Sequence, residues 1–226
     1  MGRIRKAYEV CFRTLLQQAR ARRLEPGVQW LLRKAANLSA QQQLTLSDAL
    51  TRVYDELSAR PPFRRRPPAP ATLLFWCDAG LGGLARWLRG AGYDAVWRAG
   101  IDDDDLLREA RAIAATILTT DSLLMERRLL RDRILPAFWV PPTLGIPDQL
   151  GLVFRVFGLA PREPRCMSCG GELREADKES LRERIPPKTY RWLNEYYVCS
   201  RCDKLFWHGT HWLKIQRRLQ ALSGGD

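Results

Sequence analysis

The chain has 226 residues, of which 46% are hydrophobic and eight are tryptophan. This composition excludes a wholly disordered protein, and the length leaves room for one α/β domain with one or two small modules. The chain carries 37 basic and 25 acidic side chains, which gives a formal net charge of +12. Basic side chains that neutralise phosphates release condensed counterions, so this excess favours a nucleic-acid partner, with a general enrichment in arginine as the alternative.

We expect no targeting segment; a transit peptide is the alternative for the arginine-rich residues 1–23, but Glu9 and a helical pattern argue against it. No stretch approaches the ~18 apolar residues of a membrane helix. Residues 1–23 lack the continuous apolar run of a secretory signal. We therefore expect a cytoplasmic protein that does not bind a membrane.

Residues 1–59 predict a small helical module. Apolar residues recur at helical spacing from Tyr8, from Val28 and from Leu50, and Ser47 is the expected N-cap of the third helix. A module of this size is marginally stable alone, so we expect it to pack against the rest of the chain or against a partner. The module is a candidate surface for self-association or for binding another protein. The spacing of its apolar residues does not indicate which role it has.

Residues 60–71 read RPPFRRRPPAPA and predict a linker. The paired prolines favour extended geometry and the three arginines favour solvent. An arm that contacts RNA and a solvated spacer are equally good interpretations.

Residues 72–160 alternate between apolar runs and amphipathic stretches. The runs TLLFWC, YDAVW, ATILTT and AFWV are typical of buried strands, and each is followed by a helical pattern. This βαβ alternation predicts a mixed α/β fold with a parallel sheet between layers of helices.

Acidic residues follow three of the predicted segments. Asp78 ends the first strand and Asp121 the third, while Asp102–Asp105 open the helix after the second strand. The carboxyl ends of parallel strands meet at one edge of a sheet, so we expect these acids to converge. Carboxylates that repel one another at short range need a cation, and an oxygen-only cluster suits Mg²⁺ or Mn²⁺. For any one of these acids, a turn or a helix cap is the ordinary alternative.

Residues 161–226 predict a zinc ribbon followed by a basic helix. The pairs Cys166/Cys169 and Cys199/Cys202 have CxxC spacing, which lets each pair bind one ion from a single turn. Four thiolate ligands leave no open coordination position, so the expected Zn²⁺ is structural. The longer spacing between the pairs is expected to hold a helix over residues 176–184.

These motifs together resemble a known family. The segments CDAGLGGLARWLRGAGYD, DDDDLLREA and ILTTDSLL, followed by the two cysteine pairs and WHGTHW, are similar to the Mut-seven C-terminal (Mut7-C) RNase domain, a group of PIN-like nucleases with a zinc ribbon. The resemblance implies a PIN-like fold, cleavage of RNA, and metal-binding catalytic roles for Asp78, Asp103 or Asp104, and Asp121. The family usually carries basic residues around the last of these acids, where this chain has Thr120 and Ser122.

Several basic residues are candidates for binding the RNA backbone. Arg127 and Arg128 of the next helix could replace the missing basic neighbours of Asp121. Arginine binds phosphate through two parallel hydrogen bonds, and the helix after Asp78 carries two such side chains. The full set of candidates is Arg86, Arg89, Arg127, Arg128, Lys214 and Arg217. Pairing of Arg86 with an acid of the cluster is the alternative for that side chain.

The leading hypothesis is a ribonuclease that uses Mg²⁺ or Mn²⁺ held by Asp78, Asp104 and Asp121, with Asp103 also at the catalytic site. Its RNA substrate is single-stranded or structured, and transfer and ribosomal RNA are candidates. The alternative is a non-catalytic RNA- or ribosome-binding regulator that retains the fold. Intact acids argue against the alternative, because a pure binder gains nothing from negative charge that faces phosphate.

Overall fold

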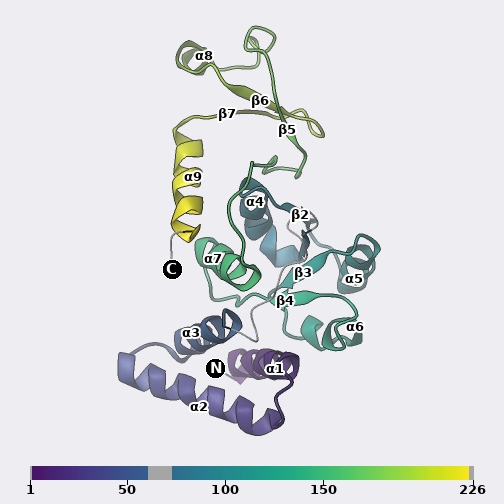
Figure 1. Ribbon diagram of the computed structural model, residues 1–226, viewed down its shortest axis with the longest axis vertical. Helices are drawn as coiled ribbons and strands as arrows, with labels where there is room; N and C mark the ends of the chain where they lie inside the picture. The colour runs from purple at the N-terminus through teal and green to yellow at the C-terminus, as the bar shows by residue number, and fades with distance from the viewer. Residues whose placement is uncertain (1, 61–72, 224–226) are drawn as a thin grey trace.

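The computed structural model describes residues 2–60 and 73–223. The predicted linker, residues 60–71, lies outside the described residues except for Arg60. Three parts follow one another along the long axis of the molecule, namely N-terminal helices, a central α/β unit and a small C-terminal sheet with its helices (Figure 1). Within the described ranges, no helix combines the length and the apolar character needed to cross a bilayer.

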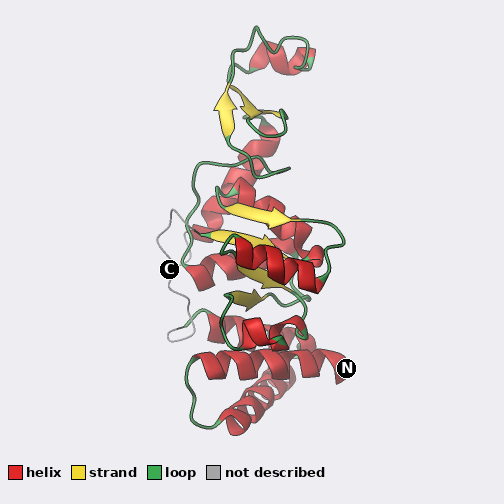
Figure 2. Ribbon diagram, turned by 90° about the vertical axis from the view of Figure 1, so that its right-hand side faces the viewer, coloured by secondary structure: helices red, strands yellow, loops and turns green. Residues whose placement is uncertain are grey.

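The central unit is built on a parallel sheet with the strand order β2-β1-β3-β4. Figure 2 shows the strands of this sheet in yellow, with helices on either side. The mixed α/β fold expected from the sequence is confirmed. The three strands β1, β3 and β4 are buried along nearly their whole length, which requires cover on both faces. The strands are β1 (Leu74–Cys77), β2 (Asp94–Trp97), β3 (Thr116–Thr119) and β4 (Ala137–Trp139). The helices are α4 (Gly82–Gly90), α5 (Asp103–Ala112), α6 (Arg128–Arg131) and α7 (Ile146–Phe157), with the 3-10 helices η2 (Ala79–Leu81) and η3 (Leu124–Glu126).

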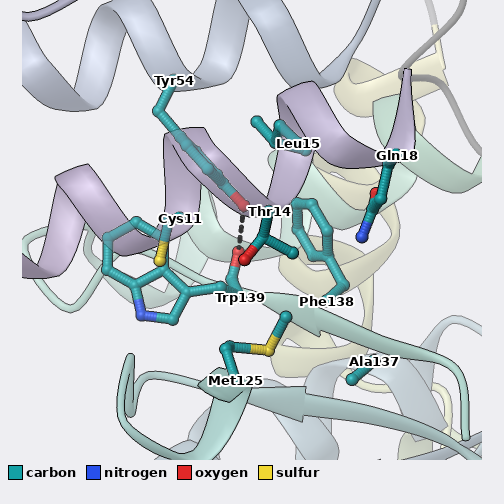
Figure 3. A pocket seen from close by; sticks show the side chains of 9 residues that line it. All are labelled: Cys11, Thr14, Leu15, Gln18, Tyr54, Met125, Ala137, Phe138 and Trp139. Carbon is teal, nitrogen blue, oxygen red and sulfur yellow. Dashed lines mark hydrogen bonds between the residues drawn. The ribbon is translucent and has the colours of Figure 1, made fainter. Parts of the chain in front are cut away.

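The N-terminal helices pack on the β4 edge of this sheet. They are α1 (Gly2–Gln18), α2 (Leu24–Gln42) and α3 (Leu46–Ser58). Their apolar residues belong to the same continuous core as those of the sheet. The hydroxyl of Tyr54 donates to the main-chain oxygen of Trp139 at 3.0 Å, and the two rings meet edge to face (Figure 3). The helices therefore cover an edge strand that would otherwise expose unpaired main-chain groups.

The third helix begins two residues earlier than expected. Thr45 is its N-cap, and the Thr45 hydroxyl accepts a hydrogen bond from the main-chain N–H of Asp48 at 3.1 Å. The prediction that Ser47 is the cap was wrong, because both residues are good capping types and only the backbone selects between them.

The C-terminal part holds an antiparallel sheet and two helices. Its own small core contains Leu181, Ile185 and Tyr196. The predicted helix over residues 176–184 is wrong, since residues 178–184 form successive turns. Their hydrogen bonds join residues three apart, and the helix instead starts at Pro187, where a missing N–H is tolerated. The elements are β5 (Leu173–Glu175), α8 (Pro187–Trp192), β6 (Tyr196–Cys199), β7 (Leu205–Trp207) and α9 (Thr210–Ser223).

The segment that connects the two sheets crosses the C-terminal end of α4. The main-chain N–H groups of Arg162 and Arg165 donate to the oxygens of Ala91 and Arg89 at 3.0 and 2.9 Å. These bonds satisfy carbonyls that a helix end leaves without partners. Gly92 has φ +90°, and a Cβ there would lie 2.5 Å from the main-chain oxygen of Glu163. Glycine therefore allows the connecting segment to press against the helix end.

Candidate active site

The carboxyl ends of β1 and β3 carry Asp78 and Asp121. The two strands are neighbours in the sheet, and α5 begins at Asp103 beyond the adjacent strand β2. Asp78 caps η2 by accepting from the N–H of Ala79. The short strands thus deliver acids from separate segments to one edge, as the parallel topology requires.

A single hydroxyl connects two of these acids. Thr119 Oγ1 donates to Asp78 Oδ2 at 2.7 Å and accepts from the main-chain N–H of Asp121 at 2.9 Å. Asp121 Oδ1 in turn accepts from the N–H of Leu123 at 2.7 Å. Thr119 is completely buried, so it fixes the orientation of both carboxyl-bearing segments.

Asp103 lies in the electrostatic field of both acids. Partial burial raises the pKa of its carboxyl, and the negative charges of Asp121 and Asp78 raise that pKa further. Arg127 acts in the opposite direction. The acids from three segments therefore share one region and repel one another, which is the condition that a bound cation relieves.

The spacing of these oxygens is looser than a closed metal cage. Among the described residues, the four cysteines are the one group whose potential ligand atoms all lie within 4.8 Å of one another. Mg²⁺ normally keeps several waters and binds one or two carboxylates together with substrate phosphate. An open set of carboxylates fits that ion better than it fits Ca²⁺, which takes more protein oxygens.

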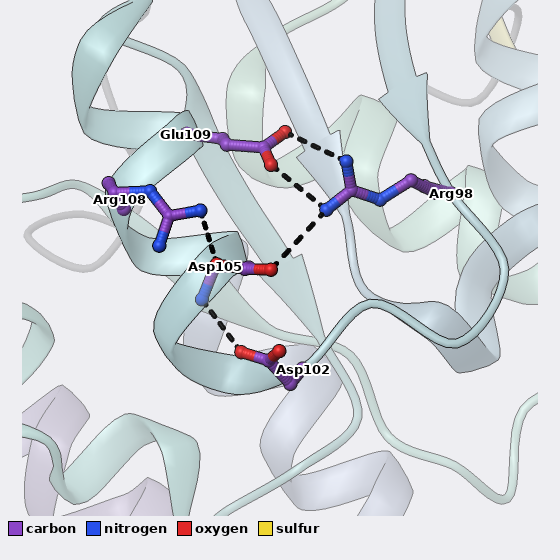
Figure 4. Close-up of polar contacts among 5 residues, drawn as sticks. All are labelled: Arg98, Asp102, Asp105, Arg108 and Glu109. Atoms are coloured by element: carbon purple, nitrogen blue, oxygen red, sulfur yellow. Dashed lines mark hydrogen bonds and ion pairs between the residues drawn. The ribbon is translucent and has the colours of Figure 1, made fainter.

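The neighbours of Asp103 on α5 are engaged elsewhere (Figure 4). Asp102 caps the helix by accepting from the N–H of Asp105 at 2.8 Å. Asp105 pairs with Arg108, and Arg98 lies 3.9 Å from the same carboxylate. Arg98 also pairs with Glu109 at 2.9 Å. Asp102 therefore caps α5, and Asp105 pairs with arginines on the surface of the helix.

Asp104 pairs with Arg127, one of the two arginines expected to replace basic neighbours of Asp121. The other, Arg128, lies 3.6 Å from Asp132 and is directed to that acid. The Asp104 side chain is 78% exposed. The structure thus favours Asp103 over Asp104 as the third member of the cluster.

The Mut7-C RNAse domain matches residues 74–219, which is more than half of the chain. The chain belongs to this family. No curated protein and no solved structure gives a match. The Mut7-C match encloses the acids and all four paired cysteines, whereas α1 to α3 lie before it.

The four paired cysteines of this Mut7-C chain form a compact cluster. Sulfur atoms of Cys166 and Cys202 are 3.7 Å apart, and those of Cys169 and Cys199 are 3.4 Å apart. Zn–S bonds of ~2.3 Å in a tetrahedron place sulfurs roughly 3.8 Å apart, so the group could hold zinc. Burial raises the pKa of Cys199, but hydrogen bonds from the main-chain N–H groups of Cys202 and Arg201 and from the thiols of Cys169 and Cys202 outweigh it and lower the pKa to about 6. Thiolate, the form that binds metal, is thereby favoured at Cys199, whereas burial raises the pKa of Cys166 and Cys169.

The structure corrects the expectation for Arg89. This side chain is buried, and its Nε donates to the main-chain oxygen of Ala95 at 2.6 Å while Nη1 donates to that of Ser168 at 2.8 Å. It joins β2 to the first cysteine pair and is unable to reach the RNA backbone. Gly170, next to this contact, has φ +78°, a left-handed conformation that favours glycine.

The other three basic candidates lie on the surface. Arg86 is exposed on α4 and lines a cavity beside the cysteine-bearing sheet. Lys214 and Arg217 are exposed on α9, whose opposite face buries Ile215 and Leu219.

Two residues near the acids were not found from the sequence. Thr119 is a polar residue in a buried strand, two residues before Asp121. This polar position close to a candidate acid could have identified it from the sequence. Trp97 donates from its indole N–H to the oxygen of Ala79 at 2.9 Å. A Cβ on Gly82 would lie 2.7 Å from the Trp97 ring, so the ring packs against the turn that follows Asp78.

Proposed function

We propose that this protein is a divalent-metal-dependent ribonuclease whose catalytic acids are Asp78, Asp103 and Asp121. The observation that carries the proposal is that Asp78 and Asp121 follow neighbouring parallel strands and are joined through the Thr119 hydroxyl, with Asp103 at the start of α5 on the same edge of the sheet. The match to an RNase domain over the same residues supports RNA as the substrate.

The residues of the site have distinct tasks in this proposal. When bound, Mg²⁺ or Mn²⁺ supplies Lewis-acid activation of the phosphodiester and of the attacking water. Thr119 holds Asp78 and Asp121 in position, so that little reorganisation is needed when substrate arrives. Arg127 lies close enough to Asp103 to influence its carboxyl and binds a phosphate oxygen once it is released from Asp104.

The test is cleavage of labelled single-stranded, hairpin and transfer RNA with Mg²⁺ or Mn²⁺. Asp78→Asn, Asp103→Asn and Asp121→Asn should each lower the rate by about a hundredfold or more, the scale of losing several kcal/mol of electrostatic stabilisation. Asp104→Asn should cost much less, and Asp132→Asn, at the C-cap of α6, is the matched surface control.

A second readout does not depend on activity. Mg²⁺ should raise the melting temperature of the wild-type protein, because it binds only the folded cluster, and should have less effect on Asp103→Asn. Cleavage that persists in all three variants would overturn the assignment. Wild-type protein that binds RNA but never cleaves it would favour the non-catalytic regulator instead.

We further propose that the cysteine cluster holds one structural Zn²⁺ and that the N-terminal helices brace the β4 edge. The buried apolar faces of those helices support an internal role, since they are already used against the sheet. Metal analysis of purified protein should return about one zinc per chain. Four titratable thiols without zinc would contradict the first of these proposals.

A further inference from the structure

A cavity of about 500 Å³ separates the central unit from the C-terminal sheet. Arg86 of α4 and the segment 163–168 form one side, and β7 with the start of α9 forms the other. Its size lies within the ~300–1,000 Å³ that is usual for ligand pockets. None of the three proposed catalytic acids lines it, so it is separate from the candidate active site.

Aromatic rings dominate one side of this cavity. His208 and Trp212 stack with their ring centres 5.3 Å apart and an angle of 13° between the planes. Tyr197 lies 4.9 Å from His208, and Phe206 lines the cavity beside it. Phe206 and Tyr197 belong to neither apolar core of the described residues, so their rings are not needed to fill one.

Polar groups at the cavity suit a nucleotide. Arg86 is exposed and forms no ion pair with any residue that the structure describes. Lys204 Nζ donates to Ser168 Oγ at 3.0 Å on the cavity wall. Arg165 and Glu163 also line the cavity. The lining therefore carries three cations and one carboxylate, which leaves it with an excess of positive charge.

We propose that this cavity binds an unpaired base of an RNA strand, with the base stacked on the aromatic wall and the adjoining phosphate held by Arg86. The proposal rests on RNA being the substrate of the neighbouring acids. Aromatic platforms beside basic side chains are how proteins bind single-stranded nucleic acid, because every base offers a face to stack on. The net charge of +12 favours such a polyanion over an apolar peptide.

Helix α4 relates the cavity to the acids. Its first residue, Gly82, closely follows Asp78, whereas Arg86 lies one turn further on and Arg89 touches the cysteine-bearing loop. Nine residues span roughly 13 Å at ~1.5 Å per residue. The candidate active site and the cavity are therefore joined by one helix, and the proposal has a single RNA strand follow it.

The experiment measures binding of a fluorescent oligouridylate in the absence of divalent cations, so that no cleavage occurs. An abasic oligomer of the same length carries the same phosphates without bases. Wild-type protein should prefer the oligouridylate, and Phe206→Ala should weaken its binding by about five- to a hundredfold, the range of one lost stacking contact. Binding of the abasic oligomer should hardly change.

Two further variants test the polar groups without removing a ring. Arg86→Ala should weaken binding of both oligomers and lower the salt dependence by about one unit, as expected for one lost phosphate contact. Lys204→Ala removes a second cation of the lining and should likewise weaken both oligomers. The matched controls are Trp192→Ala, an 83% exposed ring on α8, and Arg33→Ala, an exposed cation on α2.

The outcomes separate this proposal from the proposed activity. Equal affinity of wild-type protein for both oligomers would overturn the base-binding cavity, as would a Phe206→Ala variant that is folded, contains zinc and binds normally. Loss of binding in Phe206→Ala together with wild-type protein that cleaves no RNA would overturn the nuclease and leave the cavity standing. Normal RNA cleavage by the wild-type protein, together with unchanged binding by Phe206→Ala, would overturn the base-binding cavity and leave the nuclease proposal standing.

Discussion

The two edges of the central sheet are covered in contrasting ways. At the β4 edge the N-terminal helices leave a cavity of only about 10 Å³, room for at most one water, among rings such as Tyr54 and Trp139. At the β2 edge the C-terminal sheet is attached through Arg89 and a connecting segment, and a cavity of about 500 Å³ remains beside it. Both edges carry tryptophan and tyrosine. The first edge uses these rings for packing, and the second leaves several of them facing an open space.

This contrast separates stability from recognition. A closely packed interface gains the full benefit of burial, so its residues should be costly to truncate. An open interface with aromatic walls gains little from its empty volume and is better suited to a ligand. The following perturbations of the two edges are ordered by the size of their expected effect.

Zinc removal should have the largest effect and should act only at the β2 edge. Structural zinc in small peptides contributes roughly 10–16 kcal/mol, and the cysteine-bearing sheet has only a small core of its own. A chelator should abolish amide-exchange protection in β5 to β7 while protection in β1, β3 and the N-terminal helices remains. Added Zn²⁺ should restore it. Unchanged protection in the metal-free protein would contradict a zinc-dependent fold.

Truncation at the β4 edge should come next. Tyr54 is buried, its hydroxyl bonds Trp139, and its ring contacts four aromatic neighbours. Tyr54→Ala should therefore lower the free energy of unfolding by about 3–5 kcal/mol, measured by urea denaturation. Phe206→Ala at the other edge is the matched comparison and should cost much less. Similar losses in the free energy of unfolding for Tyr54→Ala and Phe206→Ala would contradict the proposed difference between the two edges.

Replacement of Arg89 should have a smaller effect. Arg89→Met leaves carbonyl oxygens of β2 and of the cysteine-bearing loop without their donor, at a cost of about 1–3 kcal/mol. Burial already lowers the pKa of this guanidinium, so its hydrogen bonds rather than solvent stabilise it. The melting temperature should fall while zinc content is retained. Arg86→Met, on the exposed face of the same helix, should leave the melting temperature almost unchanged.

Much of this arrangement could be predicted from local patterns. The strand runs before Asp78 and Asp121 are strongly apolar, and parallel topology follows from the alternation with helices, so the position of both acids was accessible. The choice among Asp102–Asp105 was not, because four identical side chains differ only in which partner the fold brings to each. Asp104 was expected to bind metal, whereas Arg127 pairs with it and leaves Asp103 beside the other acids.

The roles of residues that depend on tertiary contacts could not be predicted from the sequence. Arg89 and Arg86 lie three residues apart on one helix and looked equivalent, yet one is buried against main-chain oxygens and the other is exposed. The turns at 178–184 carried a helical composition, but Asp177 caps them locally by accepting from the N–H of Ser180 at 2.8 Å. Such local side-chain bonds compete with helix formation and are decided by the surroundings.

The proposed binding of a base would also limit which RNA conformations the protein accepts. The hydrogen bonds of buried Arg89 to β2 and to the cysteine-bearing loop hold the central unit and that loop together beside the cavity. A paired base must first leave its stack to enter, at a cost of a few kcal/mol, whereas loops, bulges and frayed ends present bases already free. The protein should therefore bind folded RNA at loops, bulges and frayed ends, and the cavity should not take up bases that are paired in helical stems.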